Sequence, residues 1–120
     1  MDISQFLHSI NITFKEIEYT DETTIYKLNS KNNLVVCLSK DSSFIIERDL
    51  FFYLENQKID YSFLLINTID EKYFFLEHNK ISNWLKSSFE RCDKDELYFG
   101  KIVLQHRLSL NELTNKIKKL

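Results

Sequence analysis

The sequence predicts an α+β fold with an α/β-like core, in which a mixed central sheet is flanked by helices. Two continuous apolar runs, residues 34–39 and 61–67, are typical of strands covered on both faces. Residues 47–57, between them, have the apolar spacing of a helix, so the two strands are expected to pair in parallel through a right-handed crossover. The predicted element order is α-β-β-β-α-β-β-α-β-α.

Three elements are expected before the first apolar run. Residues 2–10 predict a helix, because their apolar residues recur at the spacing of one helical face. Residues 12–19 predict a strand whose alternation changes phase at Ile17, which we interpret as a β-bulge. Residues 23–28 predict a second strand.

Turns must be made from a restricted set of residues, because the chain has one glycine and no proline. Asn, Asp and Ser are the other residue types that favour turn backbone. Residues 29–33, with the pair Asn32-Asn33, therefore predict the turn before the first apolar run. The pair Asp41-Ser42 predicts the turn after it.

The second half of the chain predicts a hairpin, a helix and a last strand. Residues 69–71 turn the chain, so that residues 72–78 return as a paired strand. Residues 80–91 carry a helical apolar stripe, and Asn79 is the expected N-cap. Residues 97–105 are expected to form the last strand.

The final helix is predicted by its first turn. Ser109 and Glu112 have the spacing of a capping box, and Leu108 and Leu113 that of a hydrophobic staple. The expected buried stripe of this helix consists of Leu110, Leu113, Ile117 and Leu120.

Size and charge limit the function classes. The 120 residues predict a single domain, residues 1–120, and the formal net charge is −2. Such a balance disfavours a strongly basic nucleic-acid binder and a polybasic membrane anchor. Cys37 and Cys92 do not form a disulfide framework, and we see neither a secretion signal nor an apolar run long enough for a membrane span. We therefore expect a cytoplasmic protein without a membrane partner.

Residues 3–67 resemble the core of the PD-(D/E)xK nuclease superfamily, the restriction-endonuclease-like fold, in the order of their elements. The end of the first apolar run resembles the strand that carries acid-x-Lys in this family, and Lys40 matches the lysine. Leu38 stands where the family has Asp or Glu, while Asp21 or Glu22 matches the position of the other acid. In this family the two acids hold a divalent metal ion that activates water.

The resemblance therefore implies an impaired nuclease. Leucine cannot ligate Mg²⁺, which takes oxygen ligands. No metal site is predicted and no cofactor is expected, and Mg²⁺ would bind only if the nuclease were active. The catalytic candidates are limited to Lys40, Asp21 and Glu22.

Three groups of residues are candidates for binding. Lys40, Asp41, Ser42 and Ser43 follow the central strand, where sites gather in open α/β sheets; the alternative is a solvated turn. Tyr53, Tyr73 and Phe75 belong to an aromatic surplus that one core face cannot accommodate, so either both sheet faces are covered or an apolar patch faces a partner. Lys86 and Arg91 could face an anionic ligand or lie on a mixed, solvated surface.

The sequence leaves three functional hypotheses. The first is a catalytically impaired restriction-endonuclease-like module that binds nucleic acid or a protein of a bacterial or phage defence system. The second is a small protein-binding inhibitor, such as an anti-CRISPR or a toxin-immunity protein, acting through an aromatic surface. The third is an enzyme whose site is assembled from scattered residues. The lack of a complete catalytic motif favours binding, to a protein partner or a second copy of the chain, over catalysis.

Overall fold

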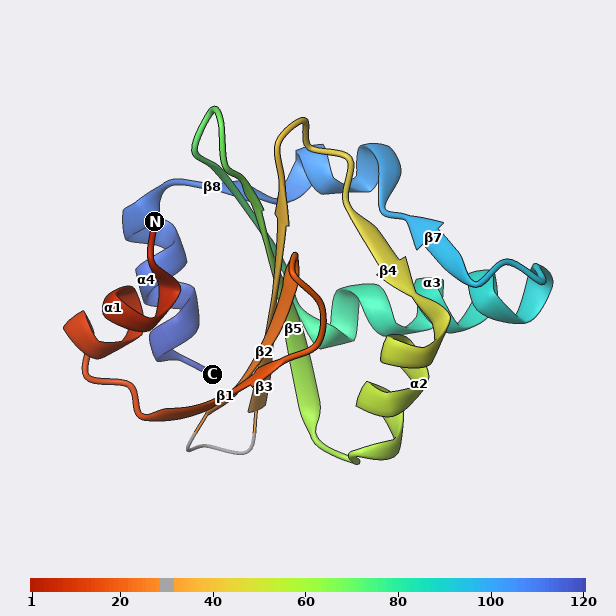
Figure 1. Cartoon of the computed structure of the whole chain (residues 1–120), viewed down its shortest axis with the longest axis horizontal. Coiled ribbons are helices and arrows are strands. Elements are labelled where there is room, and N and C mark those ends of the chain that lie inside the picture. Colours follow the sequence, from red (N-terminus) through yellow and green to blue (C-terminus); the bar gives the residue numbers. More distant parts are fainter. Residues whose placement is uncertain (29–31) are drawn as a thin grey trace.

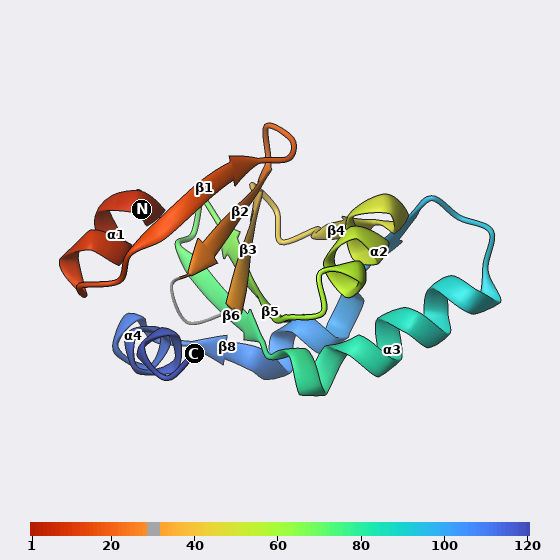
Figure 2. The same ribbon diagram turned by 90° about the horizontal axis from the view of Figure 1, so that it is seen from below.

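The computed structural model describes residues 1–28 and 32–120, and it contains a mixed six-stranded sheet between two helical layers (Figures 1 and 2). The strand order is β1-β2-β3-β5-β6-β8, and β4 pairs separately with β7. The strands are β1 (Phe14–Glu18), β2 (Thr23–Leu28), β3 (Asn32–Ser39), β4 (Ile45–Glu47), β5 (Asp60–Asn67), β6 (Lys72–Leu76), β7 (Glu96–Tyr98) and β8 (Arg107–Leu108). The helices are α1 (Ile3–Ser9), α2 (Arg48–Asn56), α3 (His78–Arg91) and α4 (Leu110–Lys118), together with a 3₁₀ segment, η1 (Gly100–His106). The predicted α+β class is confirmed.

The two apolar strands lie side by side in the middle of the sheet. β3 and β5 pair in parallel from Asn32 opposite Asp60 to Ser39 opposite Asn67. The other described strand pairs of this sheet are antiparallel. The parallel register brings the carboxyl ends of β3 and β5 to one edge of the sheet, and their amino ends to the opposite edge.

Consecutive side chains of β3 and β5 point to opposite sides of the sheet. Helices cover both sides, so the side chains on both faces are buried. One face packs beneath α2 and α3 and includes Val35, Cys37, Phe63 and Leu65. The other face packs beneath α1 and α4 and includes Leu34, Val36, Leu64 and Ile66. Figure 2 shows the two helical layers on either side of the sheet. Full burial of each such side chain contributes about 1.5–3 kcal/mol.

Two predictions for the first half of the chain are wrong. β1 pairs with β2 in unbroken register through Ile17, which lies opposite Ile25, so there is no bulge at this position. Asn32 and Asn33 are not turn residues but the first two residues of β3. The rest of the predicted turn, residues 29–31, lies outside the described residues.

Residues other than glycine adopt left-handed backbone conformations at several turns of this chain. Ser42 has a φ of 66°, which confirms the predicted turn at Asp41-Ser42. Asn11, Lys58 and Glu71 also have positive φ. Each of these positions therefore carries the steric cost of a side chain in the left-handed region.

Three predictions for the second half of the chain are also corrected. The strand expected at residues 97–105 stops at Tyr98, because Gly100, with a φ of 62°, begins η1 instead. α3 begins at His78 with Glu77 as its N-cap, so Asn79 is not the cap. Leu110 is exposed, since it lies in the first turn of α4 beside the cap, whereas the capping box itself is confirmed.

A bilayer-spanning helix, long and apolar over its whole length, does not occur in residues 1–28 and 32–120.

Candidate functional site

The carboxyl ends of β3 and β5 form the edge at which the sequence predicted a site. A pocket of about 510 Å³ opens there. It is lined by Glu22, Leu38, Ser39, Lys40, Asp41, Ser43 and Thr68. We call it the β3–β5 edge pocket. It combines residues before β2, at the end of β3 and after β5, so the fold brings together three segments that are distant in the sequence.

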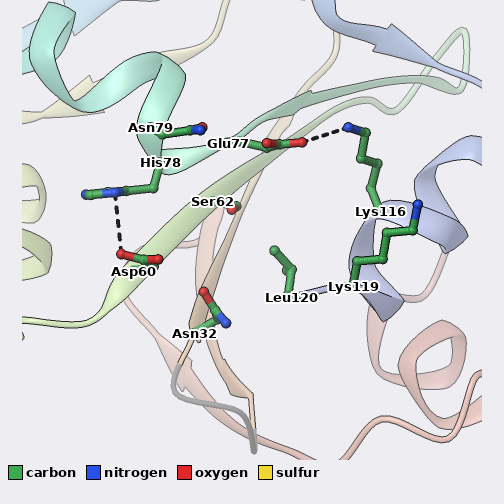
Figure 3. Close-up of a pocket in the computed structure, with 9 residues that line it drawn as sticks. All are labelled: Asn32, Asp60, Ser62, Glu77, His78, Asn79, Lys116, Lys119 and Leu120. Carbon is green, nitrogen blue, oxygen red and sulfur yellow. Dashed lines mark hydrogen bonds and ion pairs between the residues drawn. The ribbon is translucent and has the colours of Figure 1, made fainter.

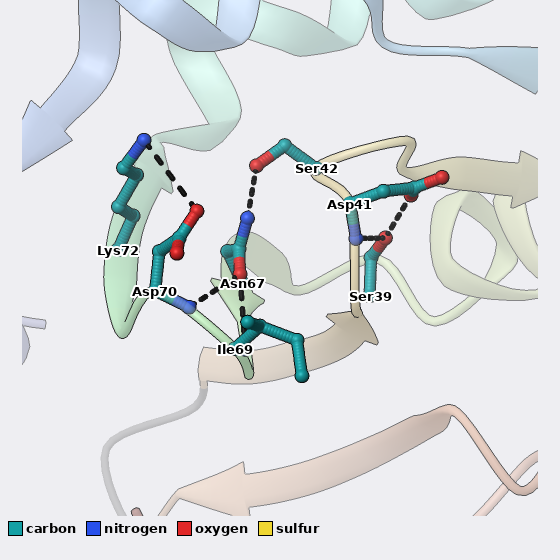
Figure 4. Close-up of polar contacts among 7 residues, drawn as sticks. All are labelled: Ser39, Asp41, Ser42, Asn67, Ile69, Asp70 and Lys72. Atoms are coloured by element: carbon teal, nitrogen blue, oxygen red, sulfur yellow. Dashed lines mark hydrogen bonds and ion pairs between the residues drawn. The ribbon is translucent and has the colours of Figure 1, made fainter.

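Asn67, the last residue of β5, holds the two loops beside this pocket in place (Figure 4). Its side-chain amide donates to Ser42 Oγ at 2.7 Å. Its Oδ1 accepts from the backbone amides of Ile69 and Asp70 at 3.0 and 2.9 Å. Asn67 is only 3% exposed. A buried side chain that uses both its donor and its acceptor in this way fixes loop geometry.

The Asp41 carboxylate is fixed by its own turn. Its Oδ1 accepts from the backbone amide of Ser43 at 3.0 Å and from Ser39 Oγ at 2.9 Å. The hydrogen bond from the Ser43 amide, followed by that from the Ser39 hydroxyl, holds the pKa of Asp41 below its ordinary value. This carboxylate therefore stabilises the loop (Figure 4).

Leu38 lines this pocket together with Glu22 and Lys40. The Leu38 amide donates to the Glu22 carbonyl at 2.8 Å, which extends the β2–β3 ladder by one step. Leu38 is 37% exposed, although it belongs to β3 and follows five buried residues of that strand. The pocket therefore has an exposed aliphatic side chain, a carboxylate and an ammonium group in its lining.

The charges of the pocket do not form a metal site. Two carboxylates, those of Glu22 and Asp41, line it with a single ammonium group, that of Lys40. Across the parts of the chain that the structure describes, no group of three or more His, Cys, Asp or Glu residues is placed to hold a metal ion. The groups that line the pocket offer hydrogen bonding and apolar contact.

The remaining predicted residues lie elsewhere or are buried. Asp21 is exposed next to Glu22 but does not line the pocket. Lys86 and Arg91 are exposed on α3, where Arg91 bonds to Ser87 of its own helix.

Of the three aromatic candidates for binding, only Tyr53 is exposed, at 37%. Tyr73 is partly buried against the core beneath α1 and α4. The prediction of Phe75 as a surface residue is wrong, because it is buried in that core. Covered sheet faces therefore account for most of the aromatic surplus.

Sequence reasoning missed Asn67. The signal was present: an asparagine ends an apolar strand, and such residues commonly accept from amides two and three positions later. Its bond to Ser42 spans 25 positions and needs the parallel pairing of β3 with β5.

Comparison with known proteins gave no match: no family model, no curated protein and no solved structure is similar to this chain.

Proposed function

We propose that this chain is a catalytically impaired module of the restriction-endonuclease-like type that binds a partner protein through the β3–β5 edge pocket. The supporting observation is that Glu22, Leu38 and Lys40 line one pocket. The resemblance implies an acid at position 22, a second acid at position 38 and a lysine at position 40. The central Leu38 has no oxygen with which to ligate a metal ion.

The pairing pattern agrees with this proposal. β1, β2 and β3 pair antiparallel in sequence order, and β5 joins β3 in parallel after the intervening α2. An opening helix, three strands, a helix and a fourth strand is the element order that carried the resemblance. Agreement of element order is an argument by analogy about the scaffold, so the function depends on the pocket residues.

The charges of the pocket favour a protein over nucleic acid as the ligand. Binding to a phosphate backbone requires clustered Lys and Arg. Here a single lysine, Lys40, lines the pocket together with the carboxylates of Glu22 and Asp41. By contrast, exposed Leu38 and polar groups held by the loops offer the apolar centre and polar rim of a protein interface. A protein of a bacterial or phage defence system is the partner class we propose.

The catalytic part of the proposal is tested by incubating the purified chain with single- and double-stranded DNA and RNA in Mg²⁺ and in Mn²⁺. We expect no cleavage above that of a Lys40→Ala variant. Metal-dependent cleavage that is lost in Lys40→Ala would show that the chain is an active nuclease.

The binding part is tested by capturing partners from a lysate of the host with Leu38→Lys and Tyr53→Lys variants. Leu38 and Tyr53 are equally exposed, at 37%, so neither substitution disrupts the core and each controls for the other. We expect a stoichiometric protein that is lost with Leu38→Lys and retained with Tyr53→Lys. Low-salt titration with DNA and RNA forms the second arm, and saturable binding that depends on Lys40 would favour nucleic acid instead.

A second candidate function is a protein-binding inhibitor that acts through α2. The observation that favours it is that Phe52 and Tyr53, adjacent on α2, are both among the exposed large apolar residues. Exposed aromatic pairs are frequent anchors of protein interfaces. If this second function is correct, the Tyr53→Lys variant fails to capture the partner protein and the Leu38→Lys variant still captures it.

A further inference from the structure

A second pocket lies at the opposite edge of the sheet, where β3 and β5 begin (Figure 3). It has a volume of about 420 Å³, in the range of pockets that hold small molecules. Ser62 of β5 lies within it, and the start of α3 forms one side. On the other side Lys116 of α4 reaches toward Glu77, and Lys119, the C-cap residue of α4, also lines the pocket. We call it the α3–α4 pocket, and the proposed function makes no use of it.

Ser62 is a buried polar side chain that opens onto this pocket. It is only 3% exposed, yet it is one of the residues that line the cavity. Its hydroxyl makes no hydrogen bond to any other residue in the described part of the chain, and Figure 3 shows it facing the open space. The Ser62 hydroxyl is therefore available to form a hydrogen bond with a ligand in the pocket.

The first turn of α3 lies beside the same space, and among its amides that of Lys80 donates to the Glu77 carbonyl at 3.0 Å. α3 has 14 residues, and its N-cap Glu77 makes no side-chain hydrogen bond to the first turn. Glu77, His78 and Asn79 all line the pocket. The first amides of a helix lack intrahelical acceptors and carry the positive end of the helix dipole, which favours an anion.

Ammonium groups approach this helix end from α4. Lys116 lies in the last turn of α4 and Lys119 is its C-cap residue, three positions further on, and both line the pocket. Lys116 Nζ lies 2.8 Å from Glu77 Oε1, whereas Lys119 forms no ion pair with the described residues. Glu77 lies among cations: the hydrogen bond from Lys116 holds its pKa below the ordinary value, and the charges of Lys116, Lys80 and His106 act in the same direction.

The other side of the pocket has a different character. His78 Nδ1 lies 3.5 Å from Asp60 Oδ1, and Asp60 is largely exposed at the rim. Asn32 contributes an amide side chain to the same region (Figure 3). Carboxylate and amide oxygens accept hydrogen bonds, so this side suits hydroxyl or amino groups of a ligand rather than its anionic group.

We propose that the α3–α4 pocket binds a small phosphate monoester. The phosphate contacts the first-turn amides of α3, the Ser62 hydroxyl and the ammonium groups of Lys119 and Lys116. The uncharged part of the ligand extends toward Asp60 and Asn32. A nucleoside monophosphate has this combination of one anionic group and several hydroxyl and amino donors.

The test is calorimetric titration of the intact protein at low ionic strength with three probes: adenosine 5′-monophosphate, inorganic phosphate and adenosine. We expect saturable binding of the monophosphate, weaker binding of phosphate and none of adenosine. If neither phosphate-bearing probe binds at millimolar concentration, or if adenosine binds as well as its monophosphate, the proposal is overturned.

Single substitutions test whether the monophosphate binds in this pocket. Lys119→Ala and Ser62→Ala should each weaken binding of the monophosphate, by about tenfold or more for the lysine, since each removes a direct contact. Lys118→Ala is the matched control, because Lys118 is a neighbouring exposed lysine of α4 that does not line the pocket. Glu77→Gln removes the carboxylate that engages Lys116, so it should tighten binding severalfold. Equal weakening by Lys118→Ala and Lys119→Ala would show general charge attraction and refute this site.

Discussion

The backbone amide of Leu38 donates to the Glu22 carbonyl at 2.8 Å, so these two residues stand side by side where β2 and β3 end their pairing. Both line the β3–β5 edge pocket together with Lys40. A carboxylate at position 38 would therefore enter a pocket that already contains the carboxylate of Glu22. This relationship allows the proposed correspondence of position 38 to a metal-binding acid to be tested by placing a carboxylate there.

Leu38→Glu should create affinity for Mg²⁺ and Mn²⁺ that the natural chain lacks. The new carboxylate would stand beside that of Glu22, and the pair would supply hard oxygen ligands for these ions, whereas the Asp41 carboxylate is held by its own turn. Because Leu38 is partly exposed, the substitution should change the free energy of unfolding by only about 0.5 kcal/mol. The measurement is calorimetric titration with Mn²⁺, together with thermal denaturation with and without the ion.

Leu38→Gln is the matched control for the gain in metal affinity, because glutamine has the shape of glutamate without its charge. A double variant, Leu38→Glu with Glu22→Gln, should lose the gained affinity. If Leu38→Glu binds Mn²⁺ no better than Leu38→Gln, positions 22 and 38 do not form a common metal site, and the nuclease-derived proposal loses its main support.

The sequence predicted the parts of the fold whose signals are local. The apolar runs that became β3 and β5 are buried on both faces, and burial on both faces is what removes alternation from a strand. The helix α4 was predicted because Ser109 and Glu112 satisfy each other within one turn. The position of Lys40 at the carboxyl end of β3 was also predicted, because Lys40 directly follows the apolar run that became this strand.

The parts that were not predicted depend on contacts between distant segments. β4 and β7 have three residues each, too few for a periodic signal, and they exist because they pair with each other. Phe75 was a candidate for binding because it and its neighbour Phe74 point to opposite faces, and the sequence left open whether both faces are covered. Each of these two residues is buried on a different face of the sheet. The role of Asn67 likewise requires the loop at Ser42 to lie beside it.

Ser109→Ala should destabilise the protein by about 1 kcal/mol. The substitution removes the hydroxyl that accepts from the Glu112 amide at 3.2 Å and leaves a first-turn donor of α4 without its cap. Ser109→Asp keeps an acceptor at the N-cap and should remain close to the natural chain. Urea denaturation of the three proteins measures the difference, and equal losses for both variants would mean that the cap itself contributes little.

The stability of the protein should fall at alkaline pH through Cys37. Burial raises the pKa of this thiol from 9.0 to about 12, while the hydrogen bond from Thr23 opposes the shift. The folded state therefore keeps the proton to higher pH than the unfolded chain does. Below about pH 9 the two states bind it equally, and above that the free energy of unfolding decreases by about 1 kcal/mol per pH unit.

The control for this pH dependence is Cys37→Val, which keeps an apolar side chain in β3 and removes the titrating group. Denaturant unfolding of both proteins between pH 7 and 11 should give a shallower decrease for the variant. Tyr26 and Tyr73, whose pKa values are also raised mainly by burial, titrate in both proteins and cancel in the comparison. Parallel pH profiles would contradict the role of Cys37.

Arg48→Ala should destabilise the segment that follows α3, with a loss of about 2 kcal/mol in the free energy of unfolding. The Arg48 guanidinium donates to the backbone carbonyls of Phe89, Cys92 and Lys94, and it lies 5.1 Å from the centre of the Phe89 ring. One side chain at the start of α2 therefore holds the end of α3 and the segment leading to β7.

Arg48→Lys should recover only part of the loss, because an ammonium group cannot reproduce the planar fork of donors. Arg91→Ala is the control, since the Arg91 guanidinium bonds only within α3, to Ser87, and its removal should cost about 0.5 kcal/mol or less. Urea denaturation gives the free energies, and amide hydrogen exchange locates the change. Faster exchange in Arg48→Ala should be concentrated in residues 89–98, because the carbonyls that Arg48 engages lie there. Exchange that rises uniformly over the whole chain would show instead that Arg48 contributes to global stability without anchoring this segment.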